Sequence, residues 1–299
     1  LMHGRISFFN YERWKAFHLA AYGILPLAMV HGYFLGYVSR NPAIRVLWVL
    51  AGAVYIFSVC SRFRRMFLAR RNLYRVVSVN REARGIWTVT LGGTAVSYLP
   101  GQFIFVRLAR RSGLSSQHPF TISSSPTRPG LSFTVKESGD FTCTAGETEQ
   151  GEAAYLEGPF GTFSILDHPA GAYMFIAGGI GVTPFISMIR YLRDTDSSKA
   201  VTLVWANKTQ EDIPFRDELT EISRFMPRLR IVHVLSREPS WPGEKGRITT
   251  GMLSGYMYES EGVEYFVCGP EGMMEAAVGS LKELGVPGNR IHRERFRLP

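Results

Sequence analysis

A glycine-rich turn separates an apolar segment from a segment with helical spacing in the second half of the chain. Residues 172–177 are apolar, and the turn ends in a Thr-Pro pair at which a helix is expected to begin. The turn contains Gly178, Gly179, Gly181, Thr183 and Pro184. Glycines let the backbone approach a diphosphate closely, and the first turn of a helix offers free N–H groups and a favourable dipole. This strand–turn–helix order therefore predicts a site for a nucleotide diphosphate, with Pro184 placed where no N–H is missed.

Two shorter motifs lie on either side of this turn. The first is His118-Pro119-Phe120-Thr121, and the second is Cys268-Gly269-Pro270, which follows the apolar residues 265–267. Taken alone, an aromatic residue such as Phe120 usually belongs to a core, and a single cysteine such as Cys268 is usually buried and inert. The order and separation of the three motifs therefore carry more information than any one of them.

The segments around these motifs show two patterns of secondary structure. Before residue 166, short apolar strands alternate with glycine and proline turns, which predicts a small antiparallel barrel with the His118 motif at a strand end. The strands expected there are 76–79, 86–91, 103–108, 131–135 and 153–156. After residue 166, strands alternate with helices, which predicts a parallel sheet. The strands expected there are 172–177, 201–205, 229–235 and 265–267.

The N-terminal part contains two apolar runs. Residues 14–37 and 44–61 are each long enough for a membrane helix of about 20 residues, and a polar turn separates them. The second run is followed directly by Arg62, Arg64, Arg65, Arg70 and Arg71. Clustered arginine marks the cytoplasmic side of a membrane segment. We therefore expect residues 1–72 to form a two-helix membrane hairpin in contact with lipid, in a multi-pass protein of the cell (inner) membrane with its other domains in the cytoplasm.

Composition excludes several other classes of protein. Of the 299 residues, 45% are hydrophobic, which is too many for a disordered chain. The net charge of +9 is not accompanied by a nucleic-acid fold signature, so nucleic acid is not an expected partner. The three cysteines, Cys60, Cys143 and Cys268, are scattered, so neither a disulfide framework nor a cysteine metal site is expected.

Two histidines lie within the first apolar run. Ionisable side chains in a membrane helix are rare and usually functional. His18 and His31 are about 20 Å apart along a helix, which would suit two stacked hemes, but roughly 140° apart around it. A kink at Pro26 would reduce that angle. From the residues alone, heme ligation and a structural role both stay open.

Together the three motifs resemble those of the ferredoxin–NADP reductase superfamily, in the branch of the ferric reductases and NADPH oxidases. The resemblance covers residues 73–299 most fully. It implies an antiparallel FAD-binding barrel at 73–166 and an α/β domain with a parallel sheet, binding NAD(P), at 167–299. Members of this superfamily take a hydride from a nicotinamide and pass electrons onward through a flavin, so an NAD(P)H-dependent, FAD-containing oxidoreductase is expected.

The resemblance gives the first motif a role in flavin binding. Most of the superfamily has arginine and tyrosine at the positions of His118 and Phe120. The ferric reductase and NADPH oxidase branch has histidine and phenylalanine there, as this chain does. Phe120 would lie against the isoalloxazine ring and Thr121 would donate a hydrogen bond to its N5, with His118 and Pro119 completing the motif. A later segment resembles the one that wraps the FAD phosphates, where a lysine suits a diphosphate as a point charge. Its residues are Val135, Lys136, Gly139, Phe141 and Thr142.

The resemblance also assigns residues to the nicotinamide nucleotide. A basic group occupies the place that holds the 2′-phosphate of NADP, and guanidinium geometry matches phosphate well. This group consists of Ser236, Arg237, Lys245 and Arg247. It favours NADPH as the donor, with NADH possible, whereas the alternative is a basic surface loop that faces water.

The remaining predicted site residues surround the place of hydride transfer. Cys268 would lie beside nicotinamide C4, with Gly269 leaving room for the ring and Pro270 completing the motif. The C-terminal segment resembles the acidic and aromatic element of the superfamily. Phe296 would cover the second face of the flavin, and Glu294 would support the catalytic polar cluster of Thr121 and Cys268.

The segment from Trp14 to Gly32 resembles the fifth of six membrane helices in the same branch. Histidines at the positions of His18 and His31 there each ligate the iron of one heme b, with partners from the third helix. This chain begins Leu1-Met2 and has two apolar runs. We therefore expect it to be part of a longer six-helix protein, and expect heme to bind only in that complete protein.

The expected function is electron transfer from NADPH through FAD, and in the complete protein through hemes, to ferric iron or oxygen. One alternative is a membrane-anchored flavin reductase that serves a separate redox protein. Another is a non-catalytic heme-carrying or membrane-assembly subunit, against which the intact flavin and nicotinamide motifs argue.

Overall fold

The computed structural model describes residues 11–36, 41–71, 73–93, 96–110, 113–258 and 262–294. Contacts divide the chain into two compact units, Leu1–Leu68 and Ala69–Pro299. The second unit contains both the antiparallel and the parallel sheet.

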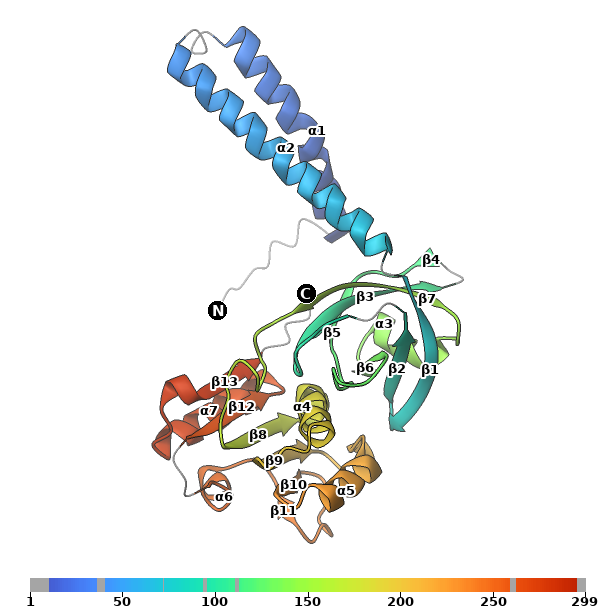
Figure 1. Cartoon of the computed structure of the whole chain (residues 1–299), viewed down its shortest axis with the longest axis vertical. Coiled ribbons are helices and arrows are strands. Elements are labelled where there is room, and N and C mark those ends of the chain that lie inside the picture. The colour runs from blue at the N-terminus through green and yellow to red at the C-terminus, as the bar shows by residue number, and fades with distance from the viewer. Residues whose placement is uncertain are drawn as a thin grey trace, which may run out of the picture. The chain divides into compact units, whose positions relative to one another are not determined.

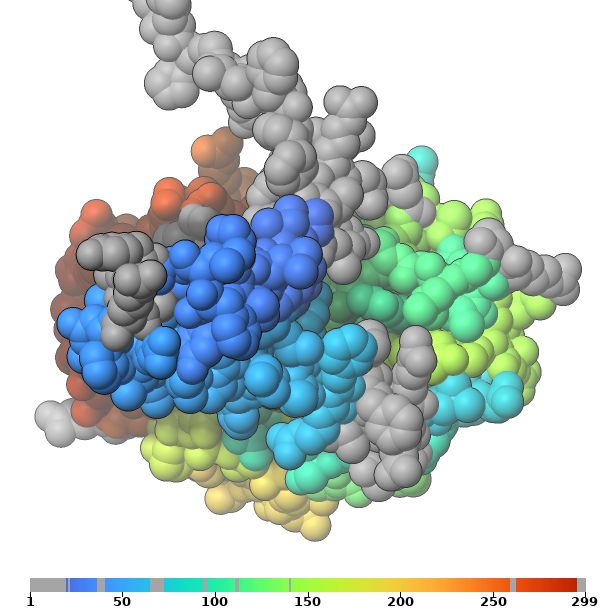
Figure 2. Space-filling model, turned by 90° about the horizontal axis from the view of Figure 1, so that it is seen from above, coloured from blue at the N-terminus to red at the C-terminus, as the bar shows by residue number. Residues whose placement is uncertain are grey.

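The first unit is a pair of helices that pack against each other. They are α1 (Tyr11–Leu35) and α2 (Pro42–Arg71). The Tyr55 hydroxyl of α2 donates a hydrogen bond to the Tyr22 carbonyl of α1 at 2.5 Å, and the two helices lie side by side in Figure 2. Trp48 of α2 lies beside Gly32 of α1, where an added Cβ would come within 2.8 Å of the indole ring. The small residue thus allows the two helices to approach each other closely.

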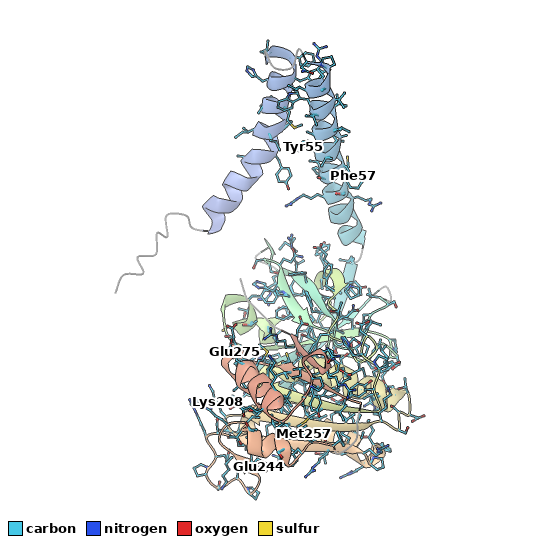
Figure 3. The ribbon with its side chains drawn as sticks, turned by 90° about the vertical axis from the view of Figure 1, so that its left-hand side faces the viewer. Tyr55, Phe57, Lys208, Glu244, Met257 and Glu275 are labelled. Carbon is cyan, nitrogen blue, oxygen red and sulfur yellow. The ribbon has the colours of Figure 1, made fainter. Side chains whose placement is uncertain are left out.

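The outer surface of this helix pair is apolar. Phe57 lies two residues after Tyr55 on α2 (Figure 3) and is 74% exposed. Within the described residues, the segment Pro42–Arg64 is long and apolar enough to cross a membrane, and none of its most apolar part is buried. The apolar stretch of α1 is shorter, Tyr22–Leu35, so one helix rather than the expected two meets this criterion. A crossing by α1 stays a prediction.

The second unit begins with an antiparallel sheet. Its strands in the described part of the chain are β1 (Leu73–Ala83), β2 (Ile86–Gly92), β3 (Phe103–Arg110), β4 (Gly113–Leu114), β5 (His118–Thr121), β6 (Leu131–Lys136) and β7 (Ala153–Phe160). Their order is β4-β3-β7-β1-β2-β6, and β5 pairs with β3. The bridge between Ile122 and Phe133 then joins the end of β5 to β6 and closes the strands into a barrel. The predicted antiparallel barrel is confirmed, and the His118 motif forms a strand of its own.

The barrel core follows from the alternation of side chains along each strand. In β3, Ile104, Val106 and Leu108 are buried, while Phe103 and Phe105 between them are half-buried. Successive side chains of a strand point to opposite faces, so the apolar alternation places the buried set inside the barrel.

A parallel sheet follows in the same unit. Its strands are β8 (Ala172–Gly178), β9 (Ala200–Asn207), β10 (Leu229–Leu235), β11 (Glu244–Lys245), β12 (Val263–Cys268) and β13 (Ile291–Glu294), in the order β11-β10-β9-β8-β12-β13. All described pairs are parallel. The predicted parallel sheet is confirmed, with β13 as an additional edge strand.

Helices cover both faces of the parallel sheet, as Figure 1 shows. One face packs against α4 (Thr183–Asp194) and α5 (Arg216–Phe225), and the other against α6 (Thr250–Ser254) and α7 (Glu271–Glu283). Every residue of β8 is buried, as expected for a central strand with two covered faces. The shorter helices are α3 (Asp140–Cys143), η2 (Ala145–Glu147), η3 (Gly179–Val182), η4 (Gln210–Asp212) and η5 (Gly288–Arg290).

Helix α4 connects the barrel to the parallel-sheet domain through hydrogen bonds. The Ser187 hydroxyl donates to the Ser124 carbonyl at 2.7 Å, and Nη1 of Arg190 donates to the Ser123 carbonyl at 2.7 Å. The other edge of the Arg190 guanidinium donates to both carboxylate oxygens of Glu218 at 2.7 and 2.6 Å. Ser123 and Ser124 follow β5 almost directly, so α4 fixes the end of the His118 motif against the second domain.

We expect Arg190→Met to lower the free energy of unfolding by about 2–3 kcal/mol, because it leaves the half-buried Glu218 carboxylate and the Ser123 carbonyl without their donor. Arg193→Met is the matched control. Arg193 lies on the same helix and pairs with Asp194 at 2.8 Å, beside the barrel residue Arg128, and it approaches Glu218 only to 3.9 Å, beyond hydrogen-bond distance. Asp194 keeps Arg128 as a partner in that control, so the loss should stay below about 1 kcal/mol. Urea unfolding of the full chain gives the free energy of unfolding of each variant. Equal losses in the two variants would show that the contacts of Arg190 contribute no more to stability than those of Arg193.

Candidate functional site

Two loops meet at the carboxyl edge of the parallel sheet, and they approach each other too closely for side chains. A Cβ added at Gly181 would lie 2.6 Å from the Cys268 carbonyl oxygen. One added at Gly269, which has a φ of +155°, would lie 2.9 Å from the Gly178 nitrogen. The glycines therefore allow the loop that follows β8 to contact the loop that follows β12. This contact places the glycine turn beside the Cys268 motif.

The glycine turn is also held from the neighbouring strand. The indole nitrogen of Trp205 on β9 donates a hydrogen bond to the Gly179 carbonyl at 3.0 Å, and Trp205 is fully buried. Gly179 has a φ of +53°, which only glycine adopts readily. The turn forms η3, and Thr183 and Pro184 begin α4 directly after it. A diphosphate at this turn would therefore meet the amino end of α4.

Cys268 and Glu294 lie side by side at the same edge. They are partners in the parallel register of β12 and β13, and Cys268 is fully buried. Burial raises the pKa of the Cys268 thiol well above its usual range, and the nearby Glu294 carboxylate raises it further. Burial also raises the pKa of Glu294. The Cys268 side chain is therefore a neutral thiol at physiological pH and presents no negative charge to a bound ring.

A basic group surrounds the carboxyl end of β10. Ser236 and Arg237 follow the strand directly, and Lys245 pairs with Leu235 across β10 and β11. The Arg237 amide donates to the carbonyl of Lys208, a further exposed cation at the end of β9 that is labelled in Figure 3. Arg237, Lys245 and Arg247 are exposed. The four predicted residues thus lie on adjoining segments, and Lys208 adds a cation that the sequence analysis did not select.

The first motif contributes to an aromatic cluster at the barrel. The Phe120 ring stacks on the Phe133 ring at 5.1 Å between centroids and on the Phe141 ring at 5.6 Å. His118 lies 4.4 Å from Phe141, and burial lowers the pKa of its imidazole. His118 is therefore neutral at physiological pH and does not supply the positive charge of the arginine that it replaces. Pro119 is half-buried in the same strand.

Thr121 closes this strand, and its side chain is buried, with 4% exposed. It pairs with Phe103 of β3. The next residue, Ile122, forms the bridge that closes the barrel. The Thr121 hydroxyl shares no hydrogen bond with any other residue that the structure describes, so it is available as a donor to a bound ring.

Arg110 holds the segment that was predicted to wrap the FAD phosphates. Its guanidinium donates to the Thr144 hydroxyl and, at 3.0 Å, to the Thr144 carbonyl. It also lies 5.4 Å from the Phe141 ring centroid. Within the segment, the Thr142 hydroxyl donates to the Gly139 carbonyl at 3.2 Å. Arg110 could not be predicted from the sequence, because an arginine at the end of β3 has no local signal that links it to a segment about thirty residues later.

Two predicted flavin residues have other surroundings than expected. Val135 is buried in the barrel core, so its side chain faces other apolar residues and only its backbone is available to a ligand. The Lys136 ammonium lies 3.9 Å from the Asp212 carboxylate of the other domain. Lys136 thus has an acidic partner, and its role at a diphosphate stays a prediction.

Some predicted residues lie outside what the structure describes. These are Phe296 and the side chain of His18. His31 is exposed on α1. No group of three potential metal ligands occurs among the described residues.

Family comparisons agree with this geometry. A family model described as an FAD-binding domain matches residues 92–164, and one described as an oxidoreductase NAD-binding domain matches residues 175–279. The first match contains the His118 motif and the second contains both loops at the carboxyl edge. The chain belongs to the ferredoxin–NADP reductase superfamily. The expected NAD(P)H-dependent, FAD-containing oxidoreductase is thereby confirmed.

Similar proteins include several reductases. The glycine betaine monooxygenase reductase subunit of Chromohalobacter salexigens is 34% identical over 208 residues, which are 67% of this chain and 56% of that protein. NADH-cytochrome b5 reductase 2 of Pyricularia oryzae is 34% identical over 198 residues, or 58% and 59% of the two chains. This chain spans 56–64% of the lengths of the first curated relatives.

Solved structures share the fold of the second unit. A cytochrome P450 reductase from Amycolatopsis has a TM-score of 0.65 and 26% identity over 75% of this chain and 69% of its own. The FAD/NAD-binding domain of a nitric oxide dioxygenase from Vibrio cholerae has a TM-score of 0.67 and 21% identity over 75% of this chain and 98% of its own, which shows a common fold.

The described residues fit an FAD at the barrel. The aromatic cluster of Phe120 and Phe141 offers planar apolar surface, and the Thr121 hydroxyl bonds to no other described residue. The Arg110 guanidinium places a positive charge beside Phe141 and Thr144 of the Gly139–Thr144 segment, which suits a diphosphate. These residues would hold the flavin ring and the phosphates, respectively.

The neutral, buried state of Cys268 predicts selective alkylation. Iodoacetamide should modify the exposed Cys143 and leave Cys268 unmodified, because the reagent reaches only an accessible sulfur and Cys268 is a buried, neutral thiol. Peptide mass spectrometry gives the extent at each cysteine, and unfolding in urea should make both react equally. Modification of Cys268 at the rate of Cys143 in the folded protein would contradict its burial as a neutral thiol.

Proposed function

We propose that this chain is the reductase part of a membrane-bound flavoprotein that passes electrons from NADPH, through FAD, to a one-electron acceptor in or at the membrane. In the complete protein this acceptor would be heme b, with ferric iron or oxygen beyond it, as in the ferric reductase and NADPH oxidase branch. The observation that carries the proposal is an unburied apolar helix, Pro42–Arg64, in the same chain as flavin and nicotinamide domains.

The apolar surface of the helix pair supports a membrane location. A soluble monomer rarely exposes large contiguous apolar patches, so the surfaces of α1 and α2 require lipid or further helices to cover them. Exposed residues on α2 include Val46, Leu47, Val49, Leu50, Val54, Ile56 and Phe57. Arg62 and Arg64 mark the end of this apolar segment, which favours the cytoplasmic face for the reductase domains in the cell (inner) membrane.

The basic group at β10 supports NADPH as the donor. Exposed cations that have no carboxylate partner in the described structure can bind the 2′-phosphate, which NADH lacks. Arg237 offers a guanidinium at the strand end, and Lys245 lies beside it through the β10–β11 register. The Lys245 ammonium donates to the Pro239 carbonyl at 2.7 Å, so the turn that contains it is held in place.

The chain's own residues would arrange the two rings for hydride transfer. Bound FAD supplies a group that accepts a hydride and passes electrons on one at a time. The glycine turn and the amino end of α4 would bind the dinucleotide diphosphate, with Trp205 keeping the turn in position. The neutral Cys268 thiol would border the nicotinamide without adding charge, and the Thr121 hydroxyl would donate a hydrogen bond to the flavin. The contacts of α4 with Ser123 and Ser124 would keep these two sites in register.

The helix pair offers an incomplete heme site in the described residues. His31 provides one exposed imidazole on α1, whereas a heme with two histidine ligands requires another from a facing element. The proposal therefore assigns heme only to the complete protein, where His18 and His31 would each hold one heme iron. No step of the reductase chemistry above depends on heme.

A second candidate is a reductase that serves a separate redox protein. The names of the similar proteins favour it, since they include the reductase subunits of glycine betaine monooxygenase and of stachydrine N-demethylase. In that case the helix pair would anchor the reductase near its partner. The third alternative, a non-catalytic assembly subunit, disagrees with the confirmed oxidoreductase domains.

Removal of the Arg237 guanidinium tests the choice of nucleotide. We expect Arg237→Ala to raise KM for NADPH about tenfold or more and to leave KM for NADH nearly unchanged, because a charge-assisted contact with phosphate contributes about 1.5–3 kcal/mol. Arg228→Ala is the control, since this exposed arginine lies at the amino end of β10. Steady-state reduction of ferricyanide gives KM for each nucleotide. Equal changes in KM for NADPH and for NADH would show that Arg237 does not bind the 2′-phosphate.

Reduction spectra of membranes test the proposed electron acceptor. Carbonate-washed membranes that contain the complete protein should retain NADPH-dependent ferricyanide reduction, and NADPH should produce the absorption bands of reduced heme b. His31→Ala should lower the absorption of reduced heme b. It should leave ferricyanide reduction intact, because the flavin and nicotinamide sites lie wholly in the second unit. Washed membranes without reductase activity would contradict membrane attachment, and activity without any heme band would favour the separate redox partner.

A further inference from the structure

Asn207 carries a buried donor without a protein acceptor. The residue is 7% exposed, and its side-chain amide nitrogen has no hydrogen-bond partner in the part of the chain that the structure describes. Among the described residues, three other buried side-chain polar atoms share this property: Arg110 Nε, Glu152 Oε2 and His233 Nδ1. A buried polar group without a partner destabilises a fold, so such an atom calls for an explanation in function or in a bound ligand.

The position of Asn207 points to a ligand. It is the last residue of β9, and its neighbour Ala206 pairs with Gly178 at the start of the glycine turn. On the other side, Asn207 pairs with Leu235, the last residue of β10. Ligands of open parallel sheets bind at the carboxyl ends of the strands. None of the other three atoms belongs to the last residue of a strand in the parallel sheet.

The backbone of Asn207 already takes part in this edge. Its carbonyl accepts hydrogen bonds from the Ser236 amide at 3.1 Å and the Ser236 hydroxyl at 3.3 Å. Asn207 therefore fixes the start of the Ser236–Arg237 segment, while Trp205 on the same strand fixes the glycine turn. The end of β9 thus lies between the place proposed for the diphosphate and the place proposed for the 2′-phosphate.

We propose that Asn207 is a nucleotide-binding residue whose side-chain amide donates a hydrogen bond to the adenosine half of the dinucleotide. A dinucleotide that extends from the glycine turn to Arg237 must cross the end of β9 with its adenosine ribose and the adjoining phosphate. Both groups are oxygen acceptors that match an N–H donor. NADPH and NADH share these groups, so Asn207 serves both nucleotides, unlike Arg237. The inference rests on the proposed nucleotide orientation and adds a contact to it.

Asn207→Leu tests the proposal because it separates stability from binding. Leucine is similar in size and removes the unpartnered donor, so the protein without nucleotide should be as stable as before or more stable. Kd for NADP⁺ and for NAD⁺ should each rise about tenfold, the effect of losing one good hydrogen bond. FAD content should stay unchanged. Isothermal titration of the FAD-loaded full chain gives Kd, and thermal unfolding gives stability.

A matched control comes from His233 on the neighbouring strand. Its Nδ1 atom is also buried without a partner, but it lies two residues before the end of β10, between the rings of Trp205 and Trp241. His233→Leu should change stability and leave both Kd values unchanged. Asn207→Asp provides a second variant of the same shape, and its carboxylate should weaken binding of both nucleotides by tenfold or more through repulsion of phosphate.

The outcomes are distinct. Weaker binding of both nucleotides by either Asn207 variant, with unchanged affinity in His233→Leu, supports the proposal. Unchanged Kd values in a folded Asn207 variant overturn it, and so does an equal loss of affinity in His233→Leu, which would indicate altered packing. If the parent chain binds neither NADP⁺ nor NAD⁺, the proposed function fails before Asn207 is tested.

Discussion

The hydrogen bonds between α4 and the serine carbonyls after β5 hold the two domains of the reductase in one arrangement. Hydride transfer needs a nicotinamide from one domain and a flavin from the other in direct contact, so their relative placement decides whether the reaction occurs. One helix serves both requirements: its amino end follows the glycine turn, and Ser187 and Arg190 in its middle contact the barrel. Arg190 is also bound to Glu218 of α5, which connects the contact to a second helix.

The distribution of charge separates the site into three parts. At the centre, Cys268 is buried and neutral, and burial also raises the pKa of the neighbouring Glu294. At the end of β10, exposed Arg237, Lys245 and Arg247 form a positive surface that attracts phosphate. At the barrel, Arg110 is positive beneath the segment that would face the FAD phosphates, whereas His118 is neutral. Among the described residues, Arg237, Lys245, Arg247 and Arg110 therefore place positive charge where the phosphates would bind, whereas Cys268 and His118 beside the places of the rings are neutral.

The sequence predicted the fold well where local pattern decides it. The strand 229–235 agrees with β10 to the residue, because its apolar run and flanking polar residues reflect a buried strand directly. β13 was missed because Ile-His-Arg-Glu has little apolar pattern, and it forms a strand through pairing with β12. The first motif was expected at the end of a strand but forms β5, since its pairing with β3 depends on a partner that local sequence does not reveal.

Short motifs mark the parts of the candidate site that could be located from the sequence, and the roles assigned to their residues stay predictions. The glycine turn, the Cys268 motif and Ser236–Arg237 could be located from sequence, and the structure brings them to one edge of one sheet. The supporting residues Trp205, Asn207 and Arg190 could not, because their roles arise from contacts between strands and domains. Tryptophan in an apolar strand predicts only burial; its hydrogen bond to Gly179 depends on the register between β8 and β9.

Anaerobic rapid mixing of the FAD-loaded chain with NADPH follows electron transfer from nicotinamide to flavin without any later acceptor. We expect loss of the oxidised flavin absorption band with one NADPH consumed per FAD, and a slower rate when the transferred hydrogen of the nicotinamide is replaced by deuterium. A flavin that dithionite reduces but that neither NADPH nor NADH reduces would contradict the account.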